Sequence, residues 1–341
     1  MQIKSGVIEE THEAKTFVPE DLKTQPSSPP WARNCPTCAS SARTRLIEDR
    51  CGFEPVMGEI ERVGSSAFEG LKDRWGDEGK HAPVFPYGTC DDCGLVHAEV
   101  YPTDAALGAL YAGLSDNMEM VAESARRKTQ AGYARAIGAL PKGGRYLEIG
   151  PDTGIFLQET LEHPVFQAAD FSGFTFLEPN TDAHTALNSL PLPGDIDVQG
   201  GLALSADSGP FSLAILIHVL DHLRHPQSVL EAISDQMLPG GKILVVTHNQ
   251  TSLISRLTGR RWPGYHAQHP QLYSKSTLTD ALERAGFVDV AIENTKNYLD
   301  FNGLFSMGTQ VLGAGARSLG PLGRWQVGLP LGNMLAVAVA N

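Results

Sequence analysis

Two Cys-x-x-Cys pairs are the clearest sign of chemistry in this sequence. Cys35 and Cys38 form the first pair, and Cys90 and Cys93 form the second. Four thiolates match the tetrahedral coordination of Zn²⁺, and a pair on a tight turn can direct both sulfurs at one ion. The fifth cysteine, Cys51, is interpreted as a spare thiol. The spacing predicts a structural zinc site, with buried or free thiols as the alternative.

A glycine turn near residue 150 could hold a nucleotide-like ligand. Glu148 lies near the end of a short apolar strand, and Gly150 and Gly154 bracket a turn into a helical pattern. Such a turn lets backbone N–H groups approach a ligand, with the positive end of the helix dipole behind them. Glu178, at the end of the next apolar strand, could accept hydrogen bonds from both hydroxyls of a ribose.

Several histidines in the second half of the chain could act as a general base at neutral pH. The candidates are His222, His225, His248, His266 and His269. His218 is expected at the carboxyl end of a strand, where ligands bind in open α/β sheets. We expect His218 to line a cofactor pocket rather than to perform chemistry.

Alternating strands and helices are predicted to position these residues. Apolar runs such as 213–219 and 242–247 are typical of central parallel strands covered by helices on both faces. Strands are expected at 145–150, 174–179, 196–199, 211–219, 242–248, 288–293 and 333–340, with helices near 154–162, 180–189 and 226–237. Ser276 is predicted to cap a further helix that ends at Gly286, and residues 238–241 are predicted to form a turn. The pattern predicts an α/β fold.

Composition shifts divide the chain into four segments. Residues 1–30 are polar and predict a disordered tail, and residues 31–101 hold all five cysteines in a small module of loops and strands. Residues 102–141 predict a helical linker or lid, with one helix opening near Thr103 and a long one between Asp116 and Leu140. The main domain is expected over 142–341, with an insertion near 300–330.

The bulk composition argues against two classes of partner. The 341 residues carry a formal net charge of −12, which disfavours a nucleic-acid footprint of clustered Lys and Arg. No apolar run approaches the roughly 18–20 residues of a membrane helix, and the first residues lack the apolar core of a signal peptide. We therefore expect a cytoplasmic protein without membrane insertion.

The ordered motifs resemble those of class I S-adenosylmethionine (SAM) methyltransferases. The likeness rests on three blocks, Leu147-Glu-Ile-Gly-Pro-Asp-Thr-Gly154, then Glu178, then His218-Val-Leu-Asp-His222. It implies a Rossmann-like, mostly parallel sheet with an antiparallel last strand, and SAM as cofactor. It also implies that Gly150, Asp152 and Gly154 approach the amino-acid end of SAM and that Glu178 binds its ribose. Glu148 would orient the turn or the SAM ammonium group, and His218 would line the pocket.

The N-terminal cysteines extend the resemblance to a zinc-bearing subgroup. Its members include sugar C-methyltransferases and enzymes of natural-product pathways, and they are also similar around Gln268-His-Pro-Gln-Leu-Tyr273. A Glu–His pair and a nearby Tyr work in this region of related enzymes, and Gln268 stands here in place of the Glu. The resemblance implies catalytic roles for His269 and Tyr273, with His222 and His266 as further candidates.

Departures from the family pattern leave alternatives open. Asp152 replaces the middle glycine of the turn, where its carboxylate could repel the carboxylate of SAM or bind its ammonium group. The acid that usually contacts adenine has no clear counterpart in residues 200–205. The leading hypothesis is a methyltransferase for a small-molecule acceptor. An RNA methyltransferase with a zinc module and a non-catalytic zinc and Rossmann scaffold are the alternatives, and the sequence determines neither the methylated atom nor the oligomeric state.

Overall fold

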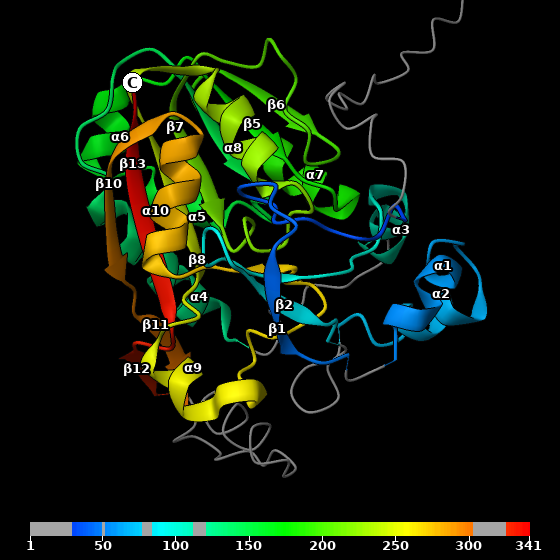
Figure 1. Ribbon diagram of the computed structural model, residues 1–341. Helices are drawn as coiled ribbons and strands as arrows, with labels where there is room; N and C mark the ends of the chain where they lie inside the picture. Colours follow the sequence, from blue (N-terminus) through cyan, green and yellow to red (C-terminus); the bar gives the residue numbers. More distant parts are fainter. Residues whose placement is uncertain (1–28, 50–51, 77–83, 112–120, 303–324) are drawn as a thin grey trace, which may run out of the picture.

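A seven-stranded sheet forms the centre of the computed structural model, which describes residues 29–49, 52–76, 84–111, 121–302 and 325–341 (Figure 1). Its strand order is β10-β13-β8-β7-β4-β5-β6. The strands are β4 (Arg145–Ile149), β5 (Gly173–Leu177), β6 (Asp195–Gln199), β7 (Phe211–Ile217), β8 (Met237–His248), β10 (Phe287–Asn294) and β13 (Asn333–Ala340). The pairs from β6 to β8 are parallel, and β13 runs antiparallel to both β8 and β10. The predicted Rossmann-like fold with an antiparallel last strand is confirmed.

Helices cover both faces of this sheet because its strands are apolar on both sides. Along β4, Leu147 and Ile149 belong to one core cluster and Tyr146 to another, as expected when successive side chains point to opposite faces. The first cluster includes residues of α8 (Pro226–Ser234) and α10 (Lys275–Arg284), which lie on the near side of the sheet in Figure 1. The second includes residues of α4 (Glu123–Tyr133), α5 (Ile155–Thr160), α6 (Pro164–Ala169) and α7 (Thr181–Asn188).

Two local predictions need correction. The helix α10 is capped by Ser274 and not by Ser276. The Ser274 hydroxyl accepts a hydrogen bond from the backbone N–H of Thr277, and the Thr277 hydroxyl accepts one from the backbone N–H of Ser274. Residues 238–241 were predicted as a turn, but they belong to β8, which begins at Met237. Backbone pairing of Phe211 with Met237 extends the strand there, and Gly240, with φ of +77°, accommodates the irregular register.

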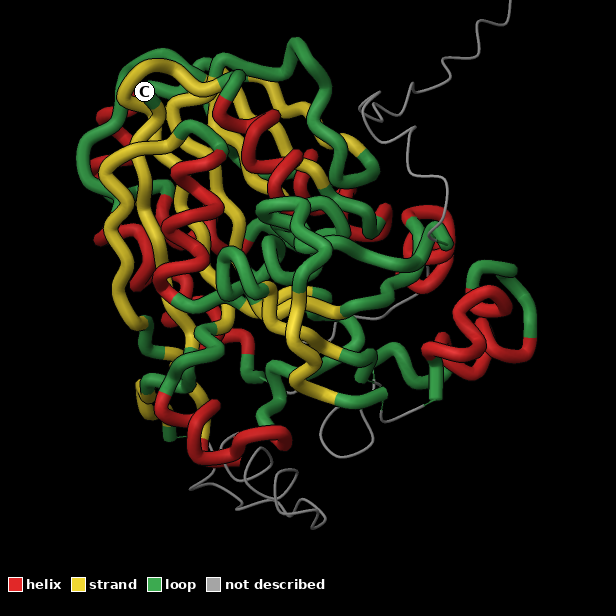
Figure 2. The backbone as a smooth tube through the Cα atoms, viewed as in Figure 1, coloured by secondary structure: helices red, strands yellow, loops and turns green. Residues whose placement is uncertain are grey.

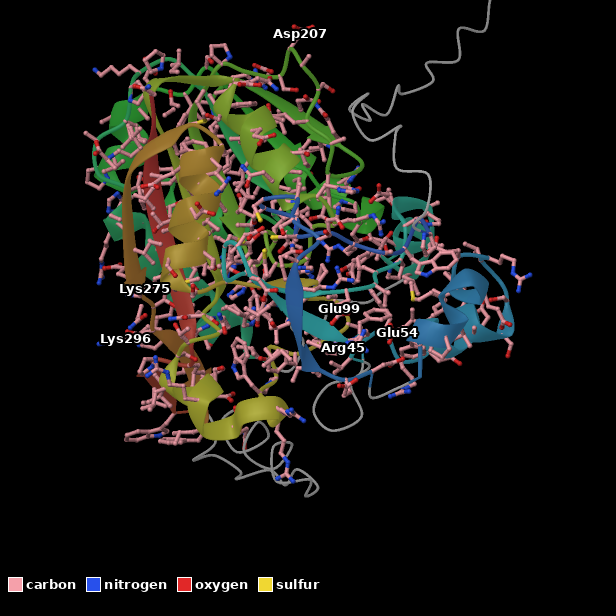
Figure 3. The ribbon with its side chains drawn as sticks, viewed as in Figure 1. Arg45, Glu54, Glu99, Asp207, Lys275 and Lys296 are labelled. Carbon is pink, nitrogen blue, oxygen red and sulfur yellow. The ribbon has the colours of Figure 1, made fainter. Side chains whose placement is uncertain are left out.

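A second, four-stranded antiparallel sheet lies beside the large one, with the order β1-β2-β3-β9 (Figure 2). Its strands are β1 (Arg43–Ile47), β2 (Tyr87–Cys90), β3 (Val96–Ala98) and β9 (Gln271–Leu272). The fourth strand comes from the second half of the chain, so the N-terminal segment does not complete this sheet by itself. Arg45 on β1 forms salt bridges with Glu99 at 2.7 Å and with Glu54 at 3.2 Å (Figure 3). These contacts join β1 to the residue after β3 and to the segment that follows β1.

The N-terminal segment also contains helices that the sequence did not predict. These are α1 (Met57–Ile60) and α2 (Ser66–Lys72), with a short 3₁₀ turn η2 (Glu54–Val56) before them. Their apolar residues share a core cluster with the small sheet and with α3 (Asp104–Tyr111). The region is therefore a mixed module with its own core.

The segment expected to be a linker divides between the two cores. Helix α3 packs in the N-terminal cluster, whereas α4 packs against the large sheet and continues into η4 (Ala134–Ala136). The structure describes the expected long helix only from Glu123, because residues 112–120 lie outside the described part. Residues 1–28 of the expected tail, Cys51 and most of the expected insertion also lie outside it.

The remaining described elements lie near the end of the large sheet in Figure 1. They are α9 (Leu253–Thr258), the 3₁₀ turn η5 (Gly259–Arg261) and the antiparallel pair β11 (Asn297–Asp300) and β12 (Gln326–Leu329). Among the described residues, no helix is both long enough and apolar enough to cross a membrane.

Candidate functional site

The four cysteines of the two pairs converge on one point. The Sγ atoms of Cys35 and Cys93 lie 3.4 Å apart, and those of Cys38 and Cys90 lie 3.5 Å apart. All four sulfurs lie within 4.8 Å of one another. Zinc–sulfur bonds of about 2.3 Å in a tetrahedron separate the sulfurs by about 3.8 Å, so the cluster fits a zinc ion.

Both cysteine pairs are shaped by the same kind of turn. The N–H of Ala39 donates to the Cys35 carbonyl at 2.9 Å, and the N–H of Gly94 donates to the Cys90 carbonyl at 2.9 Å. Ala39 and Gly94 both have positive φ, which closes each turn and leaves the two sulfurs on one side. Cys35 and Cys90 belong to the core cluster of the large sheet, so the cysteine centre fastens the N-terminal module to that sheet.

The glycine turn after β4 comes close to the loop after β7. Gly150 has φ of +66°, and a Cβ atom placed on it would lie 2.7 Å from Cγ2 of Val219. Gly154 has φ of +75° and forms the N-cap of α5. Only glycine combines this backbone conformation with so close an approach. The N–H groups of Gly150 and Gly154 already donate to the carbonyls of Leu177 and Pro151, at 2.8 and 2.9 Å.

Glu178 lies at the carboxyl end of β5 and holds the glycine turn. One carboxylate oxygen accepts from the N–H of Asp152 at 2.9 Å, and the other accepts from the N–H of Asn180 at 2.8 Å. Burial raises the pKa of Glu178, while these two N–H donors act in the opposite direction. Each oxygen keeps a lone pair for a further donor, as a ribose hydroxyl would require.

Glu148 is buried beneath the same turn. The Tyr146 hydroxyl donates to its carboxylate at 2.6 Å. Burial raises the pKa of Glu148 to about 7, and the negative charge of Glu178 adds to the shift against the effect of that hydrogen bond. A carboxyl group with such a pKa is suited to respond to a nearby cation, because a positive charge would ionise it.

Asp152 is the residue in the turn that departs from the glycine pattern. It has φ of +53°, so the backbone adopts the left-handed conformation that a glycine would supply. Its half-exposed carboxylate lies 3.9 Å from Nη1 of Arg126 on α4. Arg126 therefore places a positive charge near the carboxylate of Asp152.

Four imidazole rings gather at the carboxyl ends of β7 and β8. Ring centroids lie 5.0 Å apart for His218 and His248, 4.6 Å for His248 and His269, and 4.7 Å for His222 and His269. Burial lowers the pKa of His218 to about 4 and also lowers the pKa of His222 and His269. Burial therefore favours the neutral form of His218, His222 and His269, in which a ring nitrogen carries a free lone pair.

Asp221 gives this histidine cluster a buried negative charge. Its carboxylate lies 2.5 Å from Nδ1 of His248 and is fully buried. Burial alone would raise the pKa of Asp221, but the hydrogen bond with His248 outweighs it and holds this pKa well below its usual value. Gln271 on β9 fixes the backbone around Asp221 by donating to the carbonyls of Leu220 and Leu223 at 2.7 Å each.

The loop from 262 to 270 presents His266 and His269 to the cluster. Nδ1 of His269 lies 3.0 Å from the carbonyl oxygen of Gly264, which favours the tautomer that leaves Nε2 as a proton acceptor. The Tyr87 hydroxyl contacts the backbone carbonyls of His266 and His269 at 2.9 and 2.6 Å. Gln268 donates to the carbonyl of Trp75 at 2.9 Å, so it anchors the loop to the N-terminal module.

The structure groups most of the residues that the sequence singled out. His222, His266 and His269 meet in one cluster, whereas Tyr273 is fully buried in the core with the cysteines and its hydroxyl has no hydrogen-bond partner among the described residues. The sequence did not single out Asp221 or Gln271. A carboxylate one position before His222 was the available signal for Asp221, but Gln271 carried none.

Comparison with known families identifies the fold and the class of protein. A family model described as a methyltransferase domain (Methyltransf_23) matches residues 121–292, half of the chain. The chain belongs to this methyltransferase family, and its large sheet has the fold of class I SAM-dependent methyltransferases. A search among curated proteins found no match.

Solved structures of similar fold include three bacterial or archaeal methyltransferases. A SAM-dependent methyltransferase from Archaeoglobus fulgidus is 20% identical, with a TM-score of 0.41, over 63% of this chain and 94% of its own. One from Mesorhizobium loti is 17% identical, with a TM-score of 0.43, over 62% and 99%. The N-methyltransferase NodS from Bradyrhizobium japonicum, in complex with S-adenosylhomocysteine, is 15% identical, with a TM-score of 0.42, over 69% and 96%.

Proposed function

We propose that this protein transfers the methyl group of SAM to a small-molecule acceptor, such as a sugar or a natural-product intermediate. The observation that supports this function best is the close approach of the glycine turn to the segment after β7, which carries His218 and His222. Val219, which follows His218, packs against Gly150. A methyl donor on the turn would lie next to imidazoles that can take a proton from an acceptor.

The proposed cofactor site uses the two strand ends β4 and β5. Gly150 and Gly154 would let backbone N–H groups approach the amino-acid part of SAM, and the carboxylate of Glu178 would accept from the ribose hydroxyls. Glu148 would face the cationic part of the cofactor. The proximity of Arg126 supports binding, because its positive charge, 3.9 Å from the Asp152 carboxylate, reduces the repulsion between that carboxylate and the carboxylate of SAM.

SAM supplies an electrophilic methyl group, so the protein needs to align the acceptor and remove its proton. We assign proton removal to His269, whose Nδ1 is held by Gly264 and whose Nε2 can accept. When bound, SAM would supply the methyl carbon for the acceptor atom and its sulfur would be the leaving group, while the imidazole of His269 would take the acceptor proton. His222 and His266 would flank the acceptor, and His218 would border the cofactor. Tyr273 is retained as a candidate with a buried hydroxyl.

We further propose that Cys35, Cys38, Cys90 and Cys93 hold one structural zinc ion. Four thiolates complete its coordination, so the ion would have no open position for a substrate. Its role would be to fix the N-terminal module on the large sheet. That module contributes Tyr87 and Trp75, which hold the loop from 262 to 270. Thiols kept for metal binding fit the reducing cytoplasm.

Calorimetric titration of the full chain with SAM tests the proposal, and absence of binding at millimolar SAM would favour the scaffold alternative. Acceptor panels of nucleotide sugars are then scored by the mass gain of one methyl group. His269→Ala should lower turnover by roughly 10²–10⁴-fold at unchanged SAM affinity. His225→Ala, which removes a half-exposed histidine nearby, is the matched control. An unchanged rate for His269→Ala would reject the assigned base, and RNA binding with a steep salt dependence would favour the RNA alternative.

A further inference from the structure

A second set of metal-type ligands lies at the carboxyl ends of β7 and β8. A ring nitrogen of His218, a ring nitrogen of His248 and a carboxylate oxygen of Asp221 all lie within 4.8 Å of one another. We propose that these three residues bind a divalent transition-metal cation, distinct from the zinc of the four cysteines. The part of this inference that concerns the acceptor rests on the function proposed above, whereas the cation site itself does not.

Two buried polar atoms in this trio lack hydrogen-bond partners among the described residues. They are Nδ1 of His218 and Oδ1 of Asp221. Native proteins seldom leave such atoms unsatisfied, and an ion is one of the few explanations when the site is formed by metal-type ligands. A cation bound by these residues would satisfy groups that the protein itself does not.

The surroundings already orient the ligands. The Asn333 amide lies 3.2 Å from Nε2 of His218, and the 2.5 Å contact between Asp221 and Nδ1 of His248 holds two of the proposed ligands side by side. Metal-binding imidazoles usually have their second edge held by a polar group, which fixes the ring for coordination. The Asn333 contact supplies this for His218. Gln271 holds the backbone on both sides of Asp221, as described above.

The ligand types select the class of cation. Two imidazoles and one carboxylate suit Mn²⁺, Fe²⁺, Co²⁺, Ni²⁺ or Zn²⁺, whereas Mg²⁺ and Ca²⁺ prefer sites made of oxygen ligands. A proton relay between Asp221 and His248 is the competing explanation. Such a relay would use only His248 and Asp221, and it would not explain why the buried Nδ1 of His218 lacks a hydrogen-bond partner among the described residues.

Three protein ligands leave coordination positions open on such a cation. His269 lies against His248, with ring centroids 4.6 Å apart, so the site adjoins the proposed proton acceptor. An acceptor that binds the cation through a hydroxyl or carbonyl oxygen would meet both the cation and the base. This points to oxygen-bearing acceptors, because a cation lowers the pKa of an oxygen that it binds.

Cobalt titration of the full-length protein tests the site. One equivalent of zinc per chain is first loaded at the four cysteines and any excess is removed, and Co²⁺ is then added while its visible d–d absorption is recorded. We expect one equivalent of Co²⁺ to bind without the strong sulfur-to-cobalt charge-transfer bands of a thiolate site. Acetohydroxamic acid, a small oxygen chelator, should shift the spectrum by occupying open positions. His248→Gln and Asp221→Asn should weaken Co²⁺ binding about 100-fold or more, and His225→Gln should leave it unchanged.

The possible outcomes separate this inference from the proposed function. No Co²⁺ binding beyond the cysteine centre, or equal Co²⁺ affinity in wild type and His248→Gln, overturns the cation site and leaves the proton relay. His248 is only three-quarters buried, so this variant keeps the test decisive if Asp221→Asn does not fold. SAM binding without Co²⁺ binding would retain the proposed function and reject the cation. Co²⁺ binding without SAM binding would retain the cation site and reject the proposed function.

Discussion

Replacing Gly150 by alanine tests how closely the glycine turn approaches the loop after β7. Gly150 has φ of +66°, and the new Cβ would lie 2.7 Å from Cγ2 of Val219, well inside the usual carbon contact of about 3.5–4.0 Å. The left-handed backbone costs alanine about 1–2 kcal/mol, and the overpacking costs about 1–3 kcal/mol. Alanine also reduces the conformational freedom of the unfolded chain, which stabilises the folded state by about 0.4–1 kcal/mol. We expect a net loss of about 2–4 kcal/mol in the free energy of unfolding.

Gly143→Ala is the matched control, because Gly143 has φ of +79° but no atom within 4 Å of an added Cβ. It should lose only about 1 kcal/mol. Urea unfolding measures both variants, and calorimetry with SAM measures whether Gly150→Ala also weakens the cofactor. The double variant with Val219→Ala should recover at least about 1 kcal/mol of coupling energy. Equal destabilisation at Gly143 and Gly150, or no coupling with Val219, would refute the close-approach argument.

Three further predictions concern the proposed zinc centre and the proposed cofactor site. Cys38→Ser should release zinc and lower the midpoint of thermal unfolding, because the cysteine cluster joins the two cores. Elemental analysis measures the zinc and calorimetry measures the midpoint. An unchanged midpoint in metal-free protein would contradict this prediction. Burial raises the pKa of Glu148 to about 7, so the folded chain holds a proton between about pH 4.5 and 7 that the unfolded chain releases. The unfolding free energy should fall by about 3 kcal/mol as pH rises through that window, and Glu148→Gln should remove this slope; parallel pH profiles for the two proteins would count against it. Glu178→Gln should weaken SAM binding about 10–100-fold, through lost charge-assisted hydrogen bonds, and an unaltered dissociation constant would rule out the ribose role.

Local patterns in the sequence were enough to predict the sheet and the cysteine centre. Short apolar runs identify the strands because buried parallel strands must be apolar on both faces, as Leu147 and Tyr146 show on opposite sides of β4. Capping was harder to predict. Ser274 and Ser276 are both plausible caps in sequence. In the structure Ser274 caps the helix, and it is buried where β9 meets the helix.

The arrangement of the site needed contacts between distant segments. His248 was one of several equivalent histidines in the sequence, and only the pairing of β7 with β8 brings it to Asp221. Gln271 pairs with the N-terminal module through His97 and also bonds the loop after β7, a role that no local pattern encodes. Such roles depend on which strand ends meet, and hydrophobic periodicity does not specify that.

The sequence by itself determined the methyltransferase class of the chain, because the order of apolar strands, helices and the glycine turn is encoded by spacing along the backbone. Tertiary structure decided how these parts combine. It placed Arg126 against Asp152, it gave β9 from the second half of the chain to the N-terminal sheet, and it gathered the histidines around one buried carboxylate. The physical reason is that charge pairing and ligand clustering depend on distances through space, which a sequence fixes only after its apolar faces have packed.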